Sequence, residues 1–181
     1  DLFKSNATKD WPWCEDIVTY DNAKLAHALI LSGQWIPDGG MFEQGLEALK
    51  WLIDVQVFDS TVSIIGNQGW MHRDGQRARF DQQPIEAMAL IEACSEAYRC
   101  TGDKWWSQQA RLCLGWFLGN NDVQAVLYDF KTGGCRDGLQ ADGANQNEGA
   151  ESTLAWLISL ITIHQMLKEE GVSLTTLAQS N

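Results

Sequence analysis

Five stretches of the chain repeat apolar residues with the period of an α-helix, and this pattern constrains the fold more than any other feature. They cover residues 22–32, 41–58, 84–100, 104–118 and 150–168. Long strands are not expected, because no segment of comparable length alternates apolar and polar residues. At most, residues 61–65 and 77–81 are expected to pair as a short hairpin. The periodicity therefore predicts an all-α chain.

The predicted helices differ in how much of their surface is apolar. Segments 41–58 and 104–118 carry apolar residues on one stripe and charged residues on the other, which is typical of a helix with one face in water. Segments 84–100 and 150–168 are apolar almost all round, which predicts burial on most sides. Inner and outer helices are thus expected to alternate along the chain.

The connections also alternate, and this predicts how the helices are arranged. Short connections join the first helix to the second and the third to the fourth. The other two connections are about 25 and about 30 residues long, which is unusual in compact domains. Antiparallel packing would place both at the end where the inner helices begin. A weak repeat of about 60 residues, "YDNAKLAHAL" and "FDQQPIEAMAL", supports stacked helical hairpins.

Together these features predict an (α/α) toroid of helical hairpins with long loops at one end. About three hairpins fit into the chain, so a partial ring is expected. Residues 1–181 are predicted to form a single domain, which would be the C-terminal half of a larger six-hairpin ring. The chain begins with Asp1 rather than methionine, and we therefore expect a fragment, or a processed or trimmed chain.

Charge and cysteine content exclude several classes of protein. The net charge of −11 argues against nucleic acid and anionic membranes as partners, because both need a basic face. The chain contains neither a signal peptide pattern nor an apolar run long enough to span a membrane. Its five cysteines form no CxxC pair. These features predict reduced, mostly buried thiols in a cytoplasmic protein.

Carboxylates gather where the inner helices are expected to begin. Paired carboxylates suit glycoside chemistry, in which one acid protonates the leaving oxygen and the other activates water or attacks carbon. Helix capping is the alternative role for each of them, because helix starts present free N–H groups. Asp142 is a further acid in the last long loop. The predicted catalytic residues are Asp81, Glu86, Glu148 and Glu151.

Amides and an aromatic residue complete the predicted site. Asn and Gln both donate and accept hydrogen bonds, as sugar hydroxyls require. Nine tryptophans are an excess; most are expected in the core, but Trp70 lies in a Gly-rich loop and is the predicted stacking residue. The predicted substrate-binding residues are Asn67, Trp70, His72, Gln82, Gln83, Asp137, Asn145 and Asn147. No metal site and no cofactor is expected, since neither HxxxH nor a Gly-rich phosphate loop occurs.

Several long motifs resemble a family of bacterial proteins and domains. They are "WPWCEDIVTYDNAKL", "GNQGW", "RARFDQQPIEA", "TGDKWW", "WFLGNND" and "YDFKTGGCRDGLQADGANQNEGAESTLAWL". Members of that family occur as C-terminal extensions of glycosyltransferases or as mannosyltransferase-related proteins, and they look like the six-hairpin glycosidase superfamily. The resemblance implies an (α/α) toroid but brings no established catalytic residue.

The function expected from these features is a carbohydrate-active domain that binds, and processes, a mannose- or glucose-type saccharide. The alternative is a non-catalytic saccharide-binding or structural module that supports a glycosyltransferase. The expected partners are accordingly a saccharide ligand and either an upstream glycosyltransferase domain or the missing half of the toroid.

Overall fold

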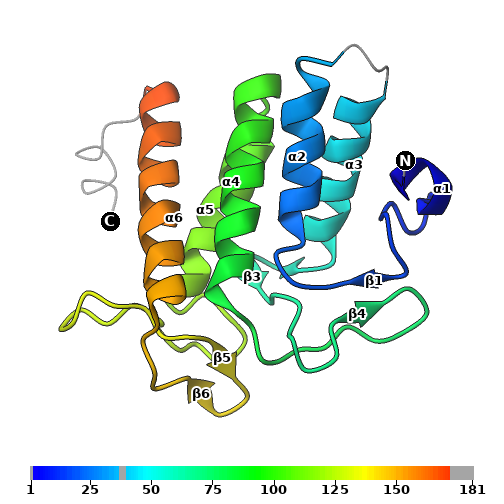
Figure 1. Ribbon diagram of the computed structural model, residues 1–181. Coiled ribbons are helices and arrows are strands. Elements are labelled where there is room, and N and C mark those ends of the chain that lie inside the picture. The colour runs from blue at the N-terminus through cyan, green and yellow to red at the C-terminus, as the bar shows by residue number, and fades with distance from the viewer. Residues whose placement is uncertain (1, 37–39, 172–181) are drawn as a thin grey trace.

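The computed structural model describes residues 2–36 and 40–171 and contains helices and short strands (Figure 1). The helices are α1 Leu2–Asn6, α2 Ala23–Gly33, α3 Met41–Asp54, α4 Pro84–Thr101, α5 Lys104–Phe117 and α6 Ala150–Glu169. The strands are β1 Ile17–Val18, β2 Val57–Phe58, β3 Thr61–Val62, β4 Met71–His72, β5 Leu139–Gln140 and β6 Gly143–Ala144.

The prediction of an all-α chain is wrong. The structure is 49% helical and also contains, within the described residues, three small antiparallel sheets. β1 pairs with β4, β2 with β3, and β5 with β6. The hairpin expected between residues 61–65 and 77–81 does not form, because β3 pairs with the preceding β2 instead. Strands of two residues are too short to leave an alternating pattern in a sequence.

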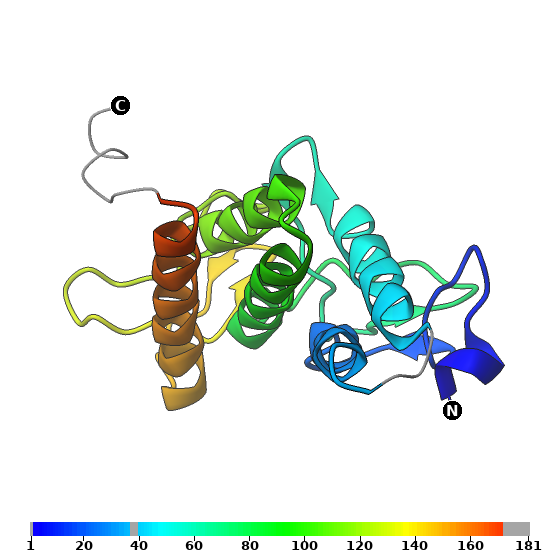
Figure 2. The same cartoon turned by 90° about the horizontal axis from the view of Figure 1, so that it is seen from above.

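The long helices form two layers rather than the predicted ring. α2, α4 and α6 lie side by side in one layer, with α3 and α5 behind them (Figures 1 and 2). α4 is central, since it packs against α2, α5 and α6. The (α/α) toroid of helical hairpins predicted from the sequence is therefore not what the structure shows.

The connection between α4 and α5 shows how local sequence ends and starts a helix. α4 begins with Pro84 in its first turn, where the missing N–H costs nothing. It ends at Gly102, whose φ of +70° lies in the left-handed region that glycine adopts without strain. Asp103 then caps α5 by accepting the backbone N–H of Trp105 at 2.9 Å. Cap, glycine and proline together explain why these two helix boundaries were predictable.

α3 ends earlier than predicted, at Asp54 rather than at residue 58. The cause is Gln56, which is fully buried just after the helix. Its amide donates to the carbonyl of Leu52 at 3.0 Å and accepts the N–H of Ile65 at 3.0 Å. These bonds turn the chain out of the helix and lead into the β2–β3 pair.

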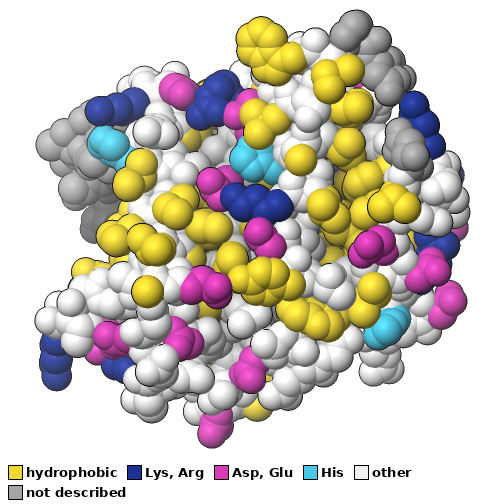
Figure 3. Space-filling view, in the orientation of Figure 1, with side chains coloured by type: hydrophobic (Ala, Val, Ile, Leu, Met, Phe, Trp, Pro, Cys, Tyr) yellow, Lys and Arg dark blue, Asp and Glu magenta, His cyan; other side chains and the backbone are white. Residues whose placement is uncertain are grey.

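α6 is buried on one side only, so the prediction of burial on most sides is wrong for residues 150–168. Its buried side includes Ala155, Trp156, Ser159, Ile163 and Met166. At about 100° per residue, the exposed stripe lies on the opposite side of the helix. The apolar residues of that stripe are Leu154, Leu157, Ile158 and Ile161. Yellow atoms over α6 mark apolar side chains on the face shown in Figure 3.

Both long connections lie at the end of the molecule where α4 and α6 begin (Figure 1). They are tied together by two backbone hydrogen bonds between Gln82 and Leu139, of 3.0 and 2.8 Å. Gly138 permits this close approach, because a Cβ there would lie 2.9 Å from the carbonyl oxygen of Gln82. The start of α4 and the β5–β6 hairpin are therefore held next to each other.

All five cysteines carry free thiols, as predicted, and four of them are buried. None of the helices in the described ranges combines the length and apolarity needed to span a bilayer.

Candidate functional site

The candidate site is the surface at which α2, α4 and α6 begin, here called the helix-start end. It comprises residues 20–22 before α2, residues 81–86 at α4 and residues 137–151 before and at α6. Helix starts expose N–H groups and carry partial positive charge, which favours carboxylates. The structure thus brings most of the predicted acids to one end of the molecule (Figure 1).

Glu86 lies in the first turn of α4 but caps α2. Its carboxyl accepts the backbone N–H of Asp21 at 2.5 Å, the N–H of Asn22 at 3.2 Å and the side-chain amide of Asn22 at 2.6 Å. Burial raises the pKa of Glu86 to about 7, although these hydrogen bonds oppose the shift. Only 1% of Glu86 is exposed, so a substrate does not reach it without movement of α2.

Tyr20 connects the start of α2 to the start of α6. Its hydroxyl donates to Oε2 of Glu151 at 3.0 Å. Desolvation, and then this hydrogen bond, raise the pKa of Tyr20 to about 12, so the phenol keeps its proton. Both side chains are exposed, and the pair therefore presents a carboxylate and a phenol at the surface.

Asp21 lies beside this pair with an unsatisfied carboxyl. Its φ of +52° places it in the left-handed region, and its Oδ1 is buried without a hydrogen-bond partner. Burial raises the pKa of Asp21; Lys24 opposes the shift, while the charges of Glu92 and Glu151 add to it. Asp21 therefore holds a proton more firmly than an ordinary aspartate, next to a second carboxyl.

Asp81 is held by the Gly-rich loop that precedes it. Gln68 donates its side-chain amide to Oδ2 of Asp81 at 3.3 Å, and the backbone N–H of Asn67 donates to the carbonyl of Asp81 at 2.8 Å. Oδ1 of Asp81 is buried without a partner. The structure therefore brings together Asn67 and Asp81, as the prediction of one site requires.

The two glutamines before α4 differ in accessibility. Gln82 is fully buried, and its Oε1 accepts the indole N–H of Trp116 at 2.7 Å and the N–H of Ile64 at 3.2 Å. Its Nε2 donates to Asp122 and to the carbonyl of Arg79. Gln82 thus ties the core together, away from any ligand.

Gln83 is the N-cap residue of α4 and makes no capping hydrogen bond with its side chain. It is half-buried, so its amide is the one of the two glutamines that a ligand at the helix-start end could reach.

Asp137 caps α6 from the loop before it. Its Oδ1 accepts the N–H of Gly149 at 2.6 Å and the hydroxyl of Ser152 at 2.8 Å, and its Oδ2 accepts the amide of Asn147. Burial opposes ionisation of Asp137, but the three hydrogen bonds outweigh it and lower its pKa. Asn145 in turn accepts the N–H of Asn147 at 2.8 Å. These three predicted binding residues therefore build the start of α6.

Glu148 is engaged by the loop at residues 128–136. The hydroxyl of Thr132 donates to its Oε2 at 2.7 Å, and Arg136 lies 3.2 Å from its Oε1. Glu148 and Glu151 therefore have separate partners, because Glu148 precedes α6 and turns toward the loop.

Trp70 directly precedes β4, and His72 pairs with Ile17 of β1 within it. Trp70 is half-buried and packs against the core. His72 is exposed in β4 and lines an open depression of about 670 Å³ with Asp16 and Arg73.

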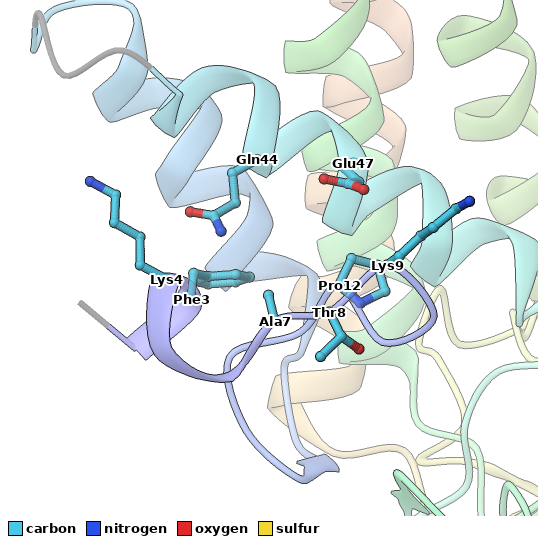
Figure 4. A pocket seen from close by; sticks show the side chains of 8 residues that line it. All are labelled: Phe3, Lys4, Ala7, Thr8, Lys9, Pro12, Gln44 and Glu47. Atoms are coloured by element: carbon cyan, nitrogen blue, oxygen red, sulfur yellow. The ribbon is translucent and has the colours of Figure 1, made fainter.

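Another pocket, of about 250 Å³, lies between the N-terminal segment and α3 (Figure 4). Gln44 and Glu47 reach it from α3, and Phe3, Ala7 and Pro12 line its other side. Among the described residues, no group of three or more His, Cys, Asp or Glu side chains could hold a metal ion.

The sequence prediction missed Tyr20 and Asp21 as site residues, although a signal for them was present. Tyr20–Asp21 and Phe80–Asp81 are the aromatic–Asp pairs of the weak internal repeat. Each pair precedes a helix of the same layer, and each aspartate has a buried carboxyl oxygen without a partner.

Neither a protein-family model nor a curated protein sequence matches the chain. The resemblance to glycosyltransferase-associated bacterial proteins accordingly stays a prediction, and the function is argued below from the site itself.

Proposed function

We propose that the chain is a carbohydrate-active domain that binds a mannose- or glucose-type saccharide at the helix-start end and processes it by acid–base chemistry. Asp21 protonates the glycosidic oxygen, and Glu151 activates water or attacks carbon. The observation that carries this proposal is the hydrogen bond from Tyr20 to Glu151, which holds an exposed carboxylate at the start of α2, beside the half-buried Asp21.

The two carboxyls differ in burial, since Asp21 is half-buried and Glu151 is exposed. One acid must keep its proton near neutral pH, and the other must be ionised. Burial and the neighbouring charge of Glu151 raise the pKa of Asp21, while Glu151 is exposed to solvent. We therefore assign Asp21, whose pKa is shifted in the direction that a proton donor needs, as the acid, and the solvent-exposed Glu151 as the base or nucleophile.

The other predicted acids support this pair rather than replace it. Glu86 fixes the backbone of Asp21, and Asp137 fixes the start of α6 that carries Glu151. Asp81 lies before α4, beside Gln68. Its carboxyl and the exposed amide of Gln68 can accept from and donate to sugar hydroxyls.

The test is a screen of manno- and gluco-oligosaccharides for hydrolysis and phosphorolysis, followed by variants of the active protein. Asp21→Asn and Glu151→Gln remove the acid and the base while keeping side-chain size. Each is expected to lower kcat by about 100-fold or more, since general acid–base groups typically contribute that much.

Glu43→Gln is the matched control, because Glu43 is exposed in the first turn of α3, outside the site. It should leave kcat unchanged. A full set of substrates without turnover, or turnover that survives both Asp21→Asn and Glu151→Gln, would refute the acid–base proposal.

A non-catalytic saccharide-binding module that supports a glycosyltransferase domain is the second candidate. The observation that favours it is an aromatic side chain, Phe130, which is 77% exposed near Glu148 rather than packed in the core. Saccharide binding without turnover in the same screen would select this function over the first.

A further inference from the structure

Phe130 is presented by a turn that the protein fixes on its own. Tyr128 and Cys135 form an isolated antiparallel bridge at the base of the turn. Within the turn, Asp129 and Gly134 share a backbone hydrogen bond of 2.9 Å, and the N–H of Gly133 donates to the carbonyl of Asp129 at 2.8 Å. In Figure 1 this loop projects beyond α6 on the left. Its backbone is therefore ordered before any ligand binds.

An aromatic ladder connects Phe130 to the core. The Phe130 ring meets Tyr128 edge to face, with centroids 4.7 Å apart and an interplanar angle of 73°. Tyr128 stacks on Trp156, with ring centroids 4.9 Å apart and an interplanar angle of 29°. Trp156, in α6, is buried in the core. Because the edge contact uses one side of Phe130, a face of this exposed ring remains available for stacking.

Polar groups surround the exposed ring. A pocket of about 350 Å³ is lined by Val126, Tyr128, Asp129, Phe130, Lys131 and Arg136, a volume within the range of ligand pockets. Arg136 contacts Oδ2 of Asp129 at 2.7 Å. The backbone N–H of Lys131, which donates to Oδ1 of Asp129 at 2.8 Å, lowers the pKa of Asp129 first among several causes. The rim thus carries the ionised carboxylate of Asp129, held in an ion pair with Arg136, and the ammonium group of the exposed Lys131.

We infer that this pocket is a saccharide-binding subsite in which the Phe130 ring stacks on the apolar face of a hexopyranose. Sugar hydroxyls donate and accept hydrogen bonds, which matches a rim with both Asp129 and Lys131. The inference shares its ligand class with the proposed function, but it rests on neither Asp21 nor Glu151.

The test is an NMR titration of the full chain with mannobiose, maltose and cellobiose. Backbone amides of Tyr128, Phe130 and Gly133 report on the pocket, while those of Asp21 and Glu151 report on the helix-start end. At least one disaccharide is expected to shift the pocket amides. Phe130→Ala should weaken that binding by about 10-fold or more, since the variant loses the ring on which the sugar stacks.

The conservative variant Phe130→Trp should keep the affinity, because it keeps a stacking face. Phe58→Ala is the matched control: Phe58 is also an exposed phenylalanine, but on β2, where Arg77 lies 5.4 Å above its ring. It should leave the pocket shifts unchanged.

The two readouts separate the failure of this inference from failure of the proposed function. Shifts at Asp21 and Glu151 without shifts at the pocket would overturn the subsite and leave the proposed function standing. Pocket shifts that persist in Phe130→Ala would also overturn it. Pocket shifts that are lost in Phe130→Ala support the subsite, whatever occurs at Asp21 and Glu151.

Discussion

Glu86 and Asp137 perform the same task at two helices of one layer, yet they differ in protonation. Each is a carboxyl from outside a helix that accepts N–H groups at its start: Glu86 at α2 and Asp137 at α6. At Glu86 burial has the larger effect and raises the pKa to about 7. At Asp137 the hydrogen bonds together have the larger effect and lower the pKa. The difference follows from the surroundings, since Glu86 is buried and Asp137 is half-exposed.

This comparison shows why capping carboxyls at two helices can differ in how they respond to pH. A well-solvated cap stays ionised and fixes its helix over the ordinary pH range. A buried capping carboxyl stabilises the start of its helix only while it is protonated, because ionising it inside the protein is unfavourable. The stability of the start of α2, which carries Tyr20 and Asp21, should therefore depend on pH near neutrality. The stability of the start of α6 should not.

Replacement of Glu86 is expected to have the largest effect on stability. Glu86→Ala leaves the backbone N–H groups of Asp21 and Asn22 without acceptors and creates a cavity. At pH 5 the free energy of unfolding should fall by about 3–4 kcal/mol, measured by urea denaturation. Glu43→Ala, at an exposed position of α3, should change it by less than about 0.5 kcal/mol. An equally small effect of Glu86→Ala would contradict the capping role.

The pH dependence of stability should separate the two caps. The pKa of Glu86 rises from 4.5 to about 7 on folding, so its contribution is complete below pH 4.5 and is lost as pH rises through about 7. The loss amounts to about 3 kcal/mol. Glu86→Gln should flatten this slope in denaturation curves measured from pH 4.5 to 8.

Asp137 should show the opposite sign. Its pKa is lowered from 3.8 on folding, so its contribution is present above pH 3.8 and is lost as pH falls through the lower folded value. If Glu86→Gln leaves the slope between pH 4.5 and 8 as steep as in the unmodified chain, the contrast between the caps fails.

The longer helices, α2 to α6, could be predicted from the sequence, because each has a strong local signal, whereas the five-residue α1 was not expected. The segment predicted at residues 84–100 forms α4 Pro84–Thr101, with proline at its start and glycine beyond its end. Such signals act within a few residues. The short strands could not be predicted, because each pairs two residues only and depends on tertiary packing around the connections.

The sequence could predict where the acids of the candidate site lie, at the helix starts, but not which groups they contact. Capping residues mark helix starts locally, so the acids at α4 and α6 were found. Glu86 acts on another helix, 65 residues away from Asp21, and no local pattern reports that contact. The apolar content of α6 likewise led to a wrong prediction of burial on most sides. The sequence does not show whether another element covers the stripe that contains Leu154 and Ile161.

Removal of the α6 cap should destabilise the protein by less than removal of the α2 cap. Asp137→Ala removes the acceptor of the N–H of Gly149, which is half-exposed, and of the hydroxyl of Ser152, which is buried. The expected loss is about 1–2 kcal/mol in urea denaturation at pH 7, typical of a lost N-cap. Glu43→Ala, at an exposed position of α3 outside this loop, again serves as the control. A loss as large as that of Glu86→Ala would erase the difference in burial on which the comparison rests.

The smallest effect is expected from removing one donor to Asp137. Ser152→Ala deletes a hydrogen bond of 2.8 Å but leaves the bonds from Gly149 and Asn147 in place. The free energy of unfolding should fall by about 0.5–1 kcal/mol. The pKa of Asp137, followed by NMR titration of its carboxyl carbon, should move upward toward its ordinary value, because a hydrogen bond to the ionised form is lost. An unchanged titration would mean that Gly149 and Asn147 alone hold the carboxylate ionised.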